Sequence, residues 1–196
     1  MPTVTTRLRG LTVARAVAAL VAATAVLLTA TPSSATARDK CLGASDAPSV
    51  QTLHRAAGAV VCLVNAERAR HGLRALRGNG DLRQAAGRHS RNMVRRGFFS
   101  HVTPSGSGLS DRLHRSGYNH GKRARHVGEA IAWGTGSPAT PNAIVAGWIA
   151  SPPHQRILLG RDFREVGVGV AIGTPQASTG GRRGRTYTLN TGAIGG

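Results

Sequence analysis

Hydrophobic residues follow two different periods along the chain, one typical of helices and one typical of strands. Over residues 50–71 and 82–96, apolar side chains recur every three or four positions, which predicts two amphipathic helices. Thr140-Pro141 opens a third apolar segment with a residue pair favoured at a helix start. Residues 166–172 and 185–191 are rich in β-branched residues and predict the two strands of a hairpin. Helices first and strands last favour an α+β fold.

The first 37 residues have the composition of a secretory signal peptide. Arg7, Arg9 and Arg15 precede the apolar run 16–30, and small residues follow it up to Ala37. A membrane anchor is the alternative, but it needs about 20 apolar residues and this run is shorter. We therefore expect export with cleavage after Ala37, an extracellular protein, and no transmembrane anchor once the signal has been removed.

The only two cysteines, Cys41 and Cys62, both lie near the expected new N-terminus. In an exported chain they predict a single disulfide, whereas metal binding by two isolated cysteines is the less common alternative. Residues 38–196 are enough for one domain with its own hydrophobic core. The expected organisation is a signal peptide over 1–37, a segment over 38–49 that the disulfide tethers to the first helix, and a domain over 50–196.

The chain is strongly basic. It has 26 Lys and Arg residues against 8 Asp and Glu residues, a formal charge of +18 that falls to +15 without the three signal arginines. Charge of this size favours association with anionic partners and does not determine the fold. A phosphate-binding loop and a dinucleotide-binding fingerprint are both missing from the sequence, so nucleotide chemistry is not expected. Anionic wall polymers or lipid head groups are the expected charged partners, rather than nucleic acid.

Three ionisable residues stand beside turn residues and apolar runs, the arrangement that places polar groups at the mouth of a cleft. They are His101, Glu129 and His154, and we expect them to converge in space. Glu is rarely buried without a partner, so Glu129 in its apolar segment needs a cation, a hydrogen-bond donor or a metal. His89 lies on the apolar stripe of the second helix and is expected to be a hydrogen-bonded core residue.

Two kinds of chemistry are open to these three residues. Two neutral imidazoles and a carboxylate are a suitable ligand set for Zn²⁺, with an open position for water or a ligand. The same groups could work as general acid and base. The sequence contains neither the His-Glu-x-x-His motif of zinc proteases nor the Gly-x-Ser-x-Gly motif of serine hydrolases. No motif therefore identifies an enzyme.

Eight short segments occur in a fixed order between about residues 60 and 192, and their order is far more specific than any one of them. They are LVNAERARHGL, LRQAAGRHSRNM, GFFSHVTPSG, DRLHRSGY, GEAIAWG, AIVAGWIASPPHQRILL, FREVGVGVAI and YTLNTG. In this order they resemble the CAP superfamily, the secreted group of cysteine-rich secretory proteins, antigen 5 and plant pathogenesis-related 1 proteins, in its bacterial form.

The resemblance implies a three-layer α-β-α sandwich with a central, mainly antiparallel sheet. It also implies a His- and Glu-lined cleft that holds a divalent metal in some members, with His101, Glu129 and His154 at the matching positions. Ser151 falls near the place of a further cleft acid in many eukaryotic members. Ala130 and Pro153 also depart from the usual family residues. The resemblance therefore supports the ionisable groups of the cleft better than it supports catalysis.

Three functional hypotheses follow from these observations. The first is a secreted, monomeric binding protein whose cleft takes a divalent metal such as zinc, or another small ligand. The second is a metal-assisted extracellular hydrolase of peptide or cell-envelope material. The third is an electrostatic binder of anionic wall polymers or lipids.

Overall fold

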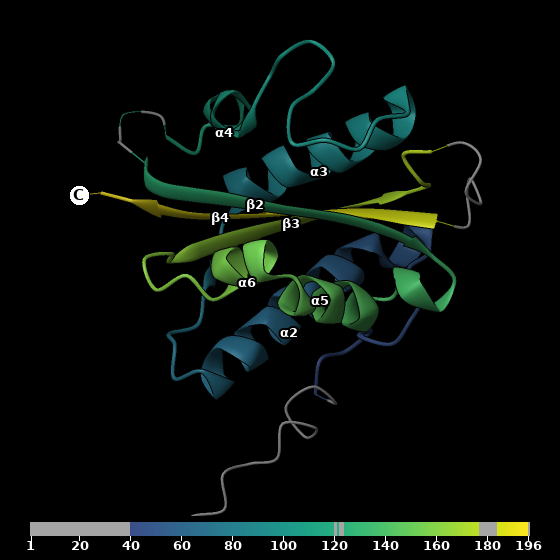
Figure 1. Cartoon of the computed structure of the whole chain (residues 1–196), viewed down its shortest axis with the longest axis horizontal. Helices are drawn as coiled ribbons and strands as arrows, with labels where there is room; N and C mark the ends of the chain where they lie inside the picture. Colours follow the sequence, from purple (N-terminus) through teal and green to yellow (C-terminus); the bar gives the residue numbers. More distant parts are fainter. Residues whose placement is uncertain (1–39, 120, 122–123, 177–183, 196) are drawn as a thin grey trace, which may run out of the picture. The chain divides into compact units, whose positions relative to one another are not determined.

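The protein is described here by a computed structural model, which covers residues 40–119, 121, 124–176 and 184–195. The expected signal peptide over 1–37 lies outside these residues. The elements along the chain are two 3-10 helices, labelled η, together with the helices and strands drawn in Figure 1: η1 (Val50–Thr52), α2 (Leu53–Arg70), β1 (Arg77–Gly78), α3 (Gly80–Arg96), α4 (Leu109–Ser116), β2 (Ala124–Thr135), η2 (Ser137–Ala139), α5 (Pro141–Ala150), α6 (Pro152–Leu158), β3 (Glu165–Ile172) and β4 (Gly184–Ile194).

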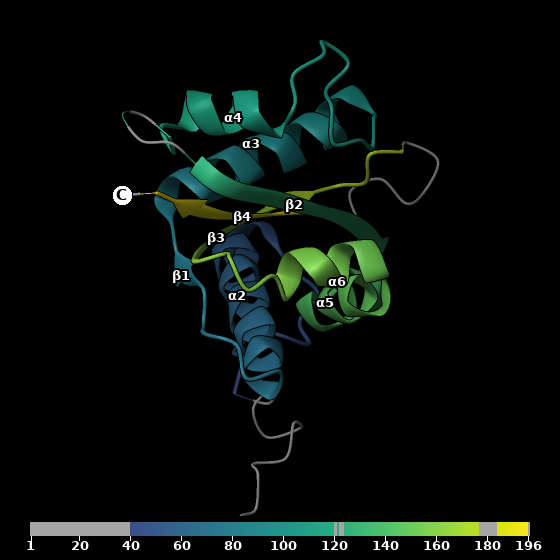
Figure 2. The same ribbon diagram turned by 60° about the vertical axis from the view of Figure 1, so that its left-hand side comes forward.

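A four-stranded sheet in the order β1-β3-β4-β2 forms the middle layer of the domain. Strand β4 pairs antiparallel with both β3 and β2, and the short β1 pairs parallel with β3. Helices α3 and α4 lie on one face of this sheet, and α2, α5 and α6 lie on the other (Figures 1 and 2). The α+β class and the three-layer α-β-α sandwich with a mainly antiparallel sheet are therefore confirmed.

The predicted C-terminal hairpin is present as β3 and β4, with Val168 opposite Leu189. Helix α5 also starts where the sequence predicts, because the Thr140 hydroxyl accepts a hydrogen bond from the Ala143 amide at 3.3 Å. Strand β2 has no counterpart among the predicted elements, since Glu129 breaks the apolar pattern that would have marked it. This strand positions the most buried charge of the candidate site.

Helix α3 rests directly on the backbone of β3. A Cβ atom on Gly167 would lie 2.0 Å from the Arg83 amide nitrogen, and one on Gly169 would lie 2.1 Å from the Gly87 nitrogen. Only glycine at these two strand positions permits such a close approach. The Ser90 hydroxyl, on the same helix face, donates to the Gly169 carbonyl at 3.1 Å. These contacts fix the helix that carries His89.

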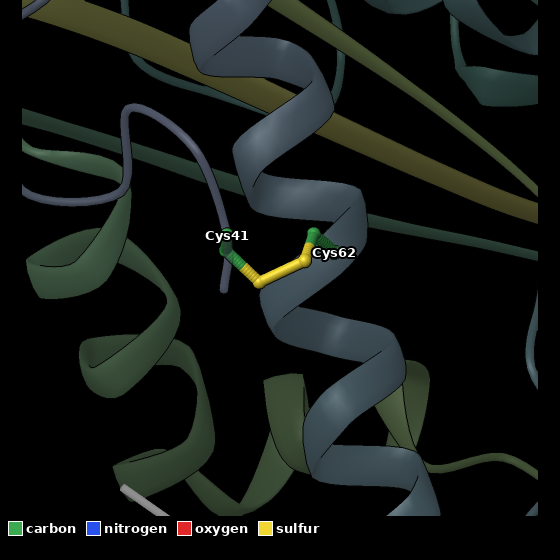
Figure 3. The surroundings of a disulfide bond; sticks show 2 residues. All are labelled: Cys41 and Cys62. Atoms are coloured by element: carbon green, nitrogen blue, oxygen red, sulfur yellow. A yellow bond between two sulfur atoms is a disulfide. The ribbon is translucent and has the colours of Figure 1, made fainter. Parts of the chain in front are cut away.

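A disulfide joins Cys41, in the segment before η1, to Cys62 in the middle of α2, as Figure 3 shows. The two Cα atoms lie 5.7 Å apart, an ordinary separation for a disulfide. The same segment is also held to α5, because the Asn142 amide donates to the Ala44 carbonyl at 2.9 Å. The predicted disulfide is confirmed. No helix in the described parts of the chain is both long enough and apolar enough to cross a membrane.

Candidate functional site

Glu129, in strand β2, is the centre of a buried polar cluster and is only 6% exposed. Arg112 of α4 donates through Nη2 to both carboxylate oxygens, at 2.8 and 2.7 Å. His101, in the loop between α3 and α4, lies with Nδ1 2.9 Å from Oε1. Exchanging the amide oxygen and nitrogen of Asn190, an orientation that its surroundings favour, lets its nitrogen donate to Oε2 at 3.1 Å. Both oxygens of the Glu129 carboxylate thus accept hydrogen bonds from neighbouring side chains.

The partners of Glu129 decide its ionisation state. Burial by itself would raise the pKa of this carboxyl group, but the hydrogen bond from His101 and the positive charge of Arg112 outweigh burial and hold the pKa below its ordinary value. Glu129 is therefore ionised at neutral pH and acts as a hydrogen-bond acceptor. It is poorly suited to donate a proton as a general acid.

Arg112 also fixes the loop that carries His101. Its Nη1 donates to the backbone carbonyls of His101 and Ser107, at 2.9 and 3.0 Å. The guanidinium group is almost fully buried, with Arg112 7% exposed. One arginine side chain therefore connects helix α4, strand β2 and the loop between α3 and α4.

His101 has one ring nitrogen inside the cluster and an exposed ring edge. Its side chain is 53% exposed, although Nδ1 faces the buried carboxylate of Glu129. An ionised carboxylate can only accept a hydrogen bond, so Nδ1 carries the proton and Nε2 of the neutral ring carries a lone pair. This assigns the His101 tautomer from its hydrogen-bond partner.

His154 comes from the opposite layer of the sandwich, in the first turn of α6. Its Nδ1 lies 2.9 Å from the hydroxyl of Ser151, the residue that precedes this helix. Burial lowers the pKa of His154, and electrostatic repulsion from His101 lowers it further. Within the described residues, no hydrogen bond joins His154 to Glu129.

His89 is a core residue, as the sequence predicts, and it also borders the candidate site. It is 1% exposed, and its Nε2 donates to the Ser100 carbonyl at 3.0 Å. The same nitrogen lies 3.9 Å from Oε1 of Glu129. Burial lowers the pKa of His89, so this ring stays neutral. It forms an inner wall of the site and supports it by packing.

The structure thus brings the sequence-predicted residues together in two pairs, His101 with Glu129 and Ser151 with His154. Sequence reasoning missed Arg112 and Asn190. It predicted that Glu129 requires a cation, a hydrogen-bond donor or a metal, and expected only His101 and His154 to lie near it. Arg112 has no distinguishing local signal because it is one of many arginines in a basic chain, and Asn190 lies in a β-strand far along the sequence.

The arrangement limits how a metal could be held. Within the described residues, no group of three or more His, Cys, Asp or Glu side chains is placed to bind a metal ion. The carboxylate oxygens of Glu129 already accept hydrogen bonds from Arg112 and His101. The donors that fit a divalent ion are the Nε2 atoms of His101 and His154, which have no protein partner in the described parts of the chain.

A family model described as "Cysteine-rich secretory protein family", CAP, matches residues 61–187, about two thirds of the chain. The chain belongs to the CAP family. The matched range extends from α2 into β4 and includes His101, Glu129, Ser151 and His154. The resemblance seen in the order of sequence motifs is therefore confirmed.

Two curated relatives of this CAP domain come from Bacillus subtilis strain 168. The uncharacterized membrane protein YlbC is 33% identical over 111 residues, which are 57% of this chain and 30% of the relative. The uncharacterized protein YkwD is 32% identical over 110 residues, which are 56% of this chain and 40% of the relative. The CAP chain thus matches less than half of the length of either relative.

Solved structures of similar fold come from two further bacteria. An extracellular protein containing an SCP domain from Bacillus anthracis is 25% identical, with a TM-score of 0.55 over 74% of this chain and 43% of that protein. An outer surface protein from Borrelia burgdorferi is 17% identical, with a TM-score of 0.57 over 69% of this chain and 90% of that protein. The second likeness concerns the fold alone.

Proposed function

We propose that this CAP protein is an extracellular binding protein whose site at His101, Glu129 and His154 takes a divalent metal such as Zn²⁺, or a small ligand in the same place. The disulfide between Cys41 and Cys62 supports a location outside the reducing cytoplasm. The similar proteins from Bacillus anthracis and Borrelia burgdorferi are described as extracellular and outer surface proteins. N-terminal sequencing of the exported protein tests the location and should read from Arg38.

The observation that carries the metal proposal is the pairing of one nitrogen in each imidazole. Nδ1 of His101 is paired with Glu129, and Nδ1 of His154 is paired with the Ser151 hydroxyl. Imidazoles that bind metals commonly have the second ring nitrogen fixed in this way, because the partner sets the tautomer and the orientation of the ring. For His101 the carboxylate requires the proton on Nδ1, so Nε2 of the neutral ring is the free ligand; for His154 this holds in the tautomer in which Nδ1 donates to the Ser151 hydroxyl.

In this proposal Glu129 orients a ligand and does not bind the metal itself. Its carboxylate holds His101 by hydrogen bonding, and Arg112 in turn holds the carboxylate. A bound Zn²⁺ would supply Lewis-acid character, with water or a small ligand completing its coordination. With only two protein ligands, binding should be weaker than at a closed structural zinc site.

Isothermal titration calorimetry with Zn²⁺ tests the proposal on protein purified without chelator or metal-affinity resin. His101→Ala and His154→Ala should each remove most of the binding, because either change leaves a single imidazole. Glu129→Gln should lower the affinity about 10- to 100-fold, the usual effect of losing the partner that orients a metal-binding histidine. His71→Ala, at the end of α2, is the matched control and should bind like the wild type.

Unchanged Zn²⁺ affinity in both histidine variants, with circular dichroism showing intact folds, would show that the metal proposal is wrong. An equal loss in His71→Ala would point to non-specific binding by surface histidines. A wild-type protein that binds no Zn²⁺ contradicts the metal part of the proposal. The extracellular location is tested separately by the N-terminus.

The second candidate function, a hydrolase of peptide or cell-envelope material, is favoured by one contact. The 2.9 Å pair of Ser151 and His154 places a hydroxyl beside an imidazole, as in sites where histidine activates serine. The enzyme hypothesis predicts turnover in a panel of peptide and cell-wall substrates that Ser151→Ala abolishes even at Zn²⁺ concentrations that saturate the variant. Absence of turnover across the panel would leave the binding function as the better account.

A further inference from the structure

Helices α3 and α4 line a polar hollow that borders the Glu129 cluster through Arg112 and His89. We call it the arginine pocket. Its volume is about 460 Å³, within the range of small-molecule sites. It is lined by Ala85, Arg88, His89, Arg91, Asn92, Arg95, Arg96, Thr103, Arg112 and Arg115. Six of these ten residues are arginines, and none is acidic.

Arg112 is the one arginine of the pocket paired with a carboxylate among the described residues, that of Glu129; the other five are not neutralised in this way. Within the described residues, no ion pair is formed by the five exposed arginines of the pocket, which are Arg88, Arg91, Arg95, Arg96 and Arg115. Three of them recur at helical spacing on α3, where like charges repel one another. The protein thus gathers like charges where dispersing them would stabilise the helix.

Two buried atoms at the inner end of the arginine pocket also lack partners in the described parts of the chain. They are Nε of Arg112 and Nδ1 of His89, in side chains that are 7% and 1% exposed. The Nε–H of Arg112 is a charged donor, and a buried donor without an acceptor is costly. An anionic oxygen entering from the pocket would satisfy this donor. The pocket therefore offers donors without carboxylate partners at its rim and one unsatisfied buried donor, Nε of Arg112, whereas Nδ1 of the neutral His89 ring is an acceptor that an anion does not satisfy.

We propose that the arginine pocket binds a ligand that carries two or more phosphate groups. Guanidinium groups match phosphate oxygens with paired, charge-assisted hydrogen bonds, which single cations such as lysine do not provide. The donors come from exposed arginines on both α3 and α4 and from buried Arg112, and linked phosphates present more acceptor oxygens to such a spread of donors than a single phosphate does. This site takes an anion, and its exposed arginines are not ligands of the proposed metal site, although Arg112 and His89 border both; variants of the exposed arginines therefore test it separately.

Calorimetric titration of the full mature chain with tripolyphosphate tests this proposal, with orthophosphate as the single-phosphate comparison. The double variant Arg88→Gln/Arg95→Gln should lower tripolyphosphate affinity at least 10-fold, because it removes two charged donors from the rim. The matched control is Arg74→Gln/Arg161→Gln, which removes the same charge at exposed positions outside the pocket. It should retain wild-type affinity within about 2-fold in 0.15 M salt, where separated surface charges are screened.

Equal weakening in the pocket variant and the control would overturn the proposal, because it would assign binding to overall charge. Tripolyphosphate binding no tighter than orthophosphate binding would also overturn it. The source of the phosphates is separated by co-sedimentation with vesicles that contain phosphatidylglycerol. Vesicle binding lost in Arg88→Gln/Arg95→Gln and competed by tripolyphosphate identifies a lipid head group, whereas tripolyphosphate binding without vesicle binding identifies a free or polymeric phosphate.

Discussion

Arg112→Met should be among the most destabilising single changes in the protein, although it keeps much of the apolar length of the side chain. The change removes a buried cation that makes two hydrogen bonds to the Glu129 carboxylate and two to backbone carbonyls. Removing one partner of a buried ion pair costs about 3–5 kcal/mol, because the other charge stays buried. At roughly 2–4 °C for each kcal/mol in a domain of this size, the melting temperature should fall by roughly 10 °C.

The loss should depend on pH, which separates an electrostatic cause from a packing defect. In the wild type the pKa of Glu129 is below its ordinary value, so its ionisation contributes stability above that ordinary value and loses it as pH falls through the folded-state pKa. Without Arg112, the effect of burial should prevail and raise the pKa of Glu129. The variant then takes up a proton as pH falls, and the difference in stability from the wild type should shrink between pH 8 and pH 5.

Urea unfolding at several pH values, followed by circular dichroism, measures this difference directly. Arg115→Met, one turn further along α4 and exposed, is the control and should change the free energy of unfolding by less than about 1 kcal/mol. A loss in Arg112→Met that is constant between pH 8 and pH 5 would refute the ionisation argument. A loss no larger than in the control would refute the importance of the buried pair itself.

Two further predictions concern the frame of the domain. Cys62→Ser should lower the free energy of unfolding, measured in urea, by about 3 kcal/mol, because the disulfide with Cys41 no longer restricts the unfolded chain. A reductant should lower the stability of the wild type by the same amount. No change in either experiment would contradict this role of the disulfide. Gly167→Ala should lower the free energy of unfolding by several kcal/mol, because its Cβ would be forced against the Arg83 backbone. Gly58→Ala, in α2 with open space around it, should instead raise the free energy of unfolding by up to about 1 kcal/mol. Similar effects at both positions would refute the close packing of α3 on β3.

The regular parts of the fold could be predicted because their signals are local. Thr140-Pro141 marks the start of α5 through capping and fixed backbone geometry, and alternating Gly and Val mark β3. Strand β2 could not be predicted in the same way. Its pattern contains Glu129, whose burial is stabilised by partners from α4, β4 and the loop after α3. The spacing of hydrophobic residues within one segment contains no information about partners that come from other parts of the chain.

Only part of the candidate site could be predicted from the sequence, for a related reason. His101 and Glu129 were expected to meet, and they are in contact at 2.9 Å. The strongest partner of Glu129 is Arg112, which is 17 residues away and looks like any other surface arginine until α4 packs over the sheet. Buried charge pairs are set by tertiary packing and not by spacing. A basic composition conceals them further, because it offers many equivalent arginines.

The contact between α3 and the bare glycine backbone of β3 has a consequence for the entropy of ligand binding. Because α3 rests on strand backbone at Gly167 and Gly169, the helix cannot slide without placing a strand side chain in its path. The wall formed by His89 and Glu129 is therefore preorganised before any ligand arrives. On the other side, the two prolines that begin α6 restrict the backbone beside His154. These restraints reduce the conformational freedom that the site would lose if it takes a ligand, so more of each contact with that ligand would appear as affinity.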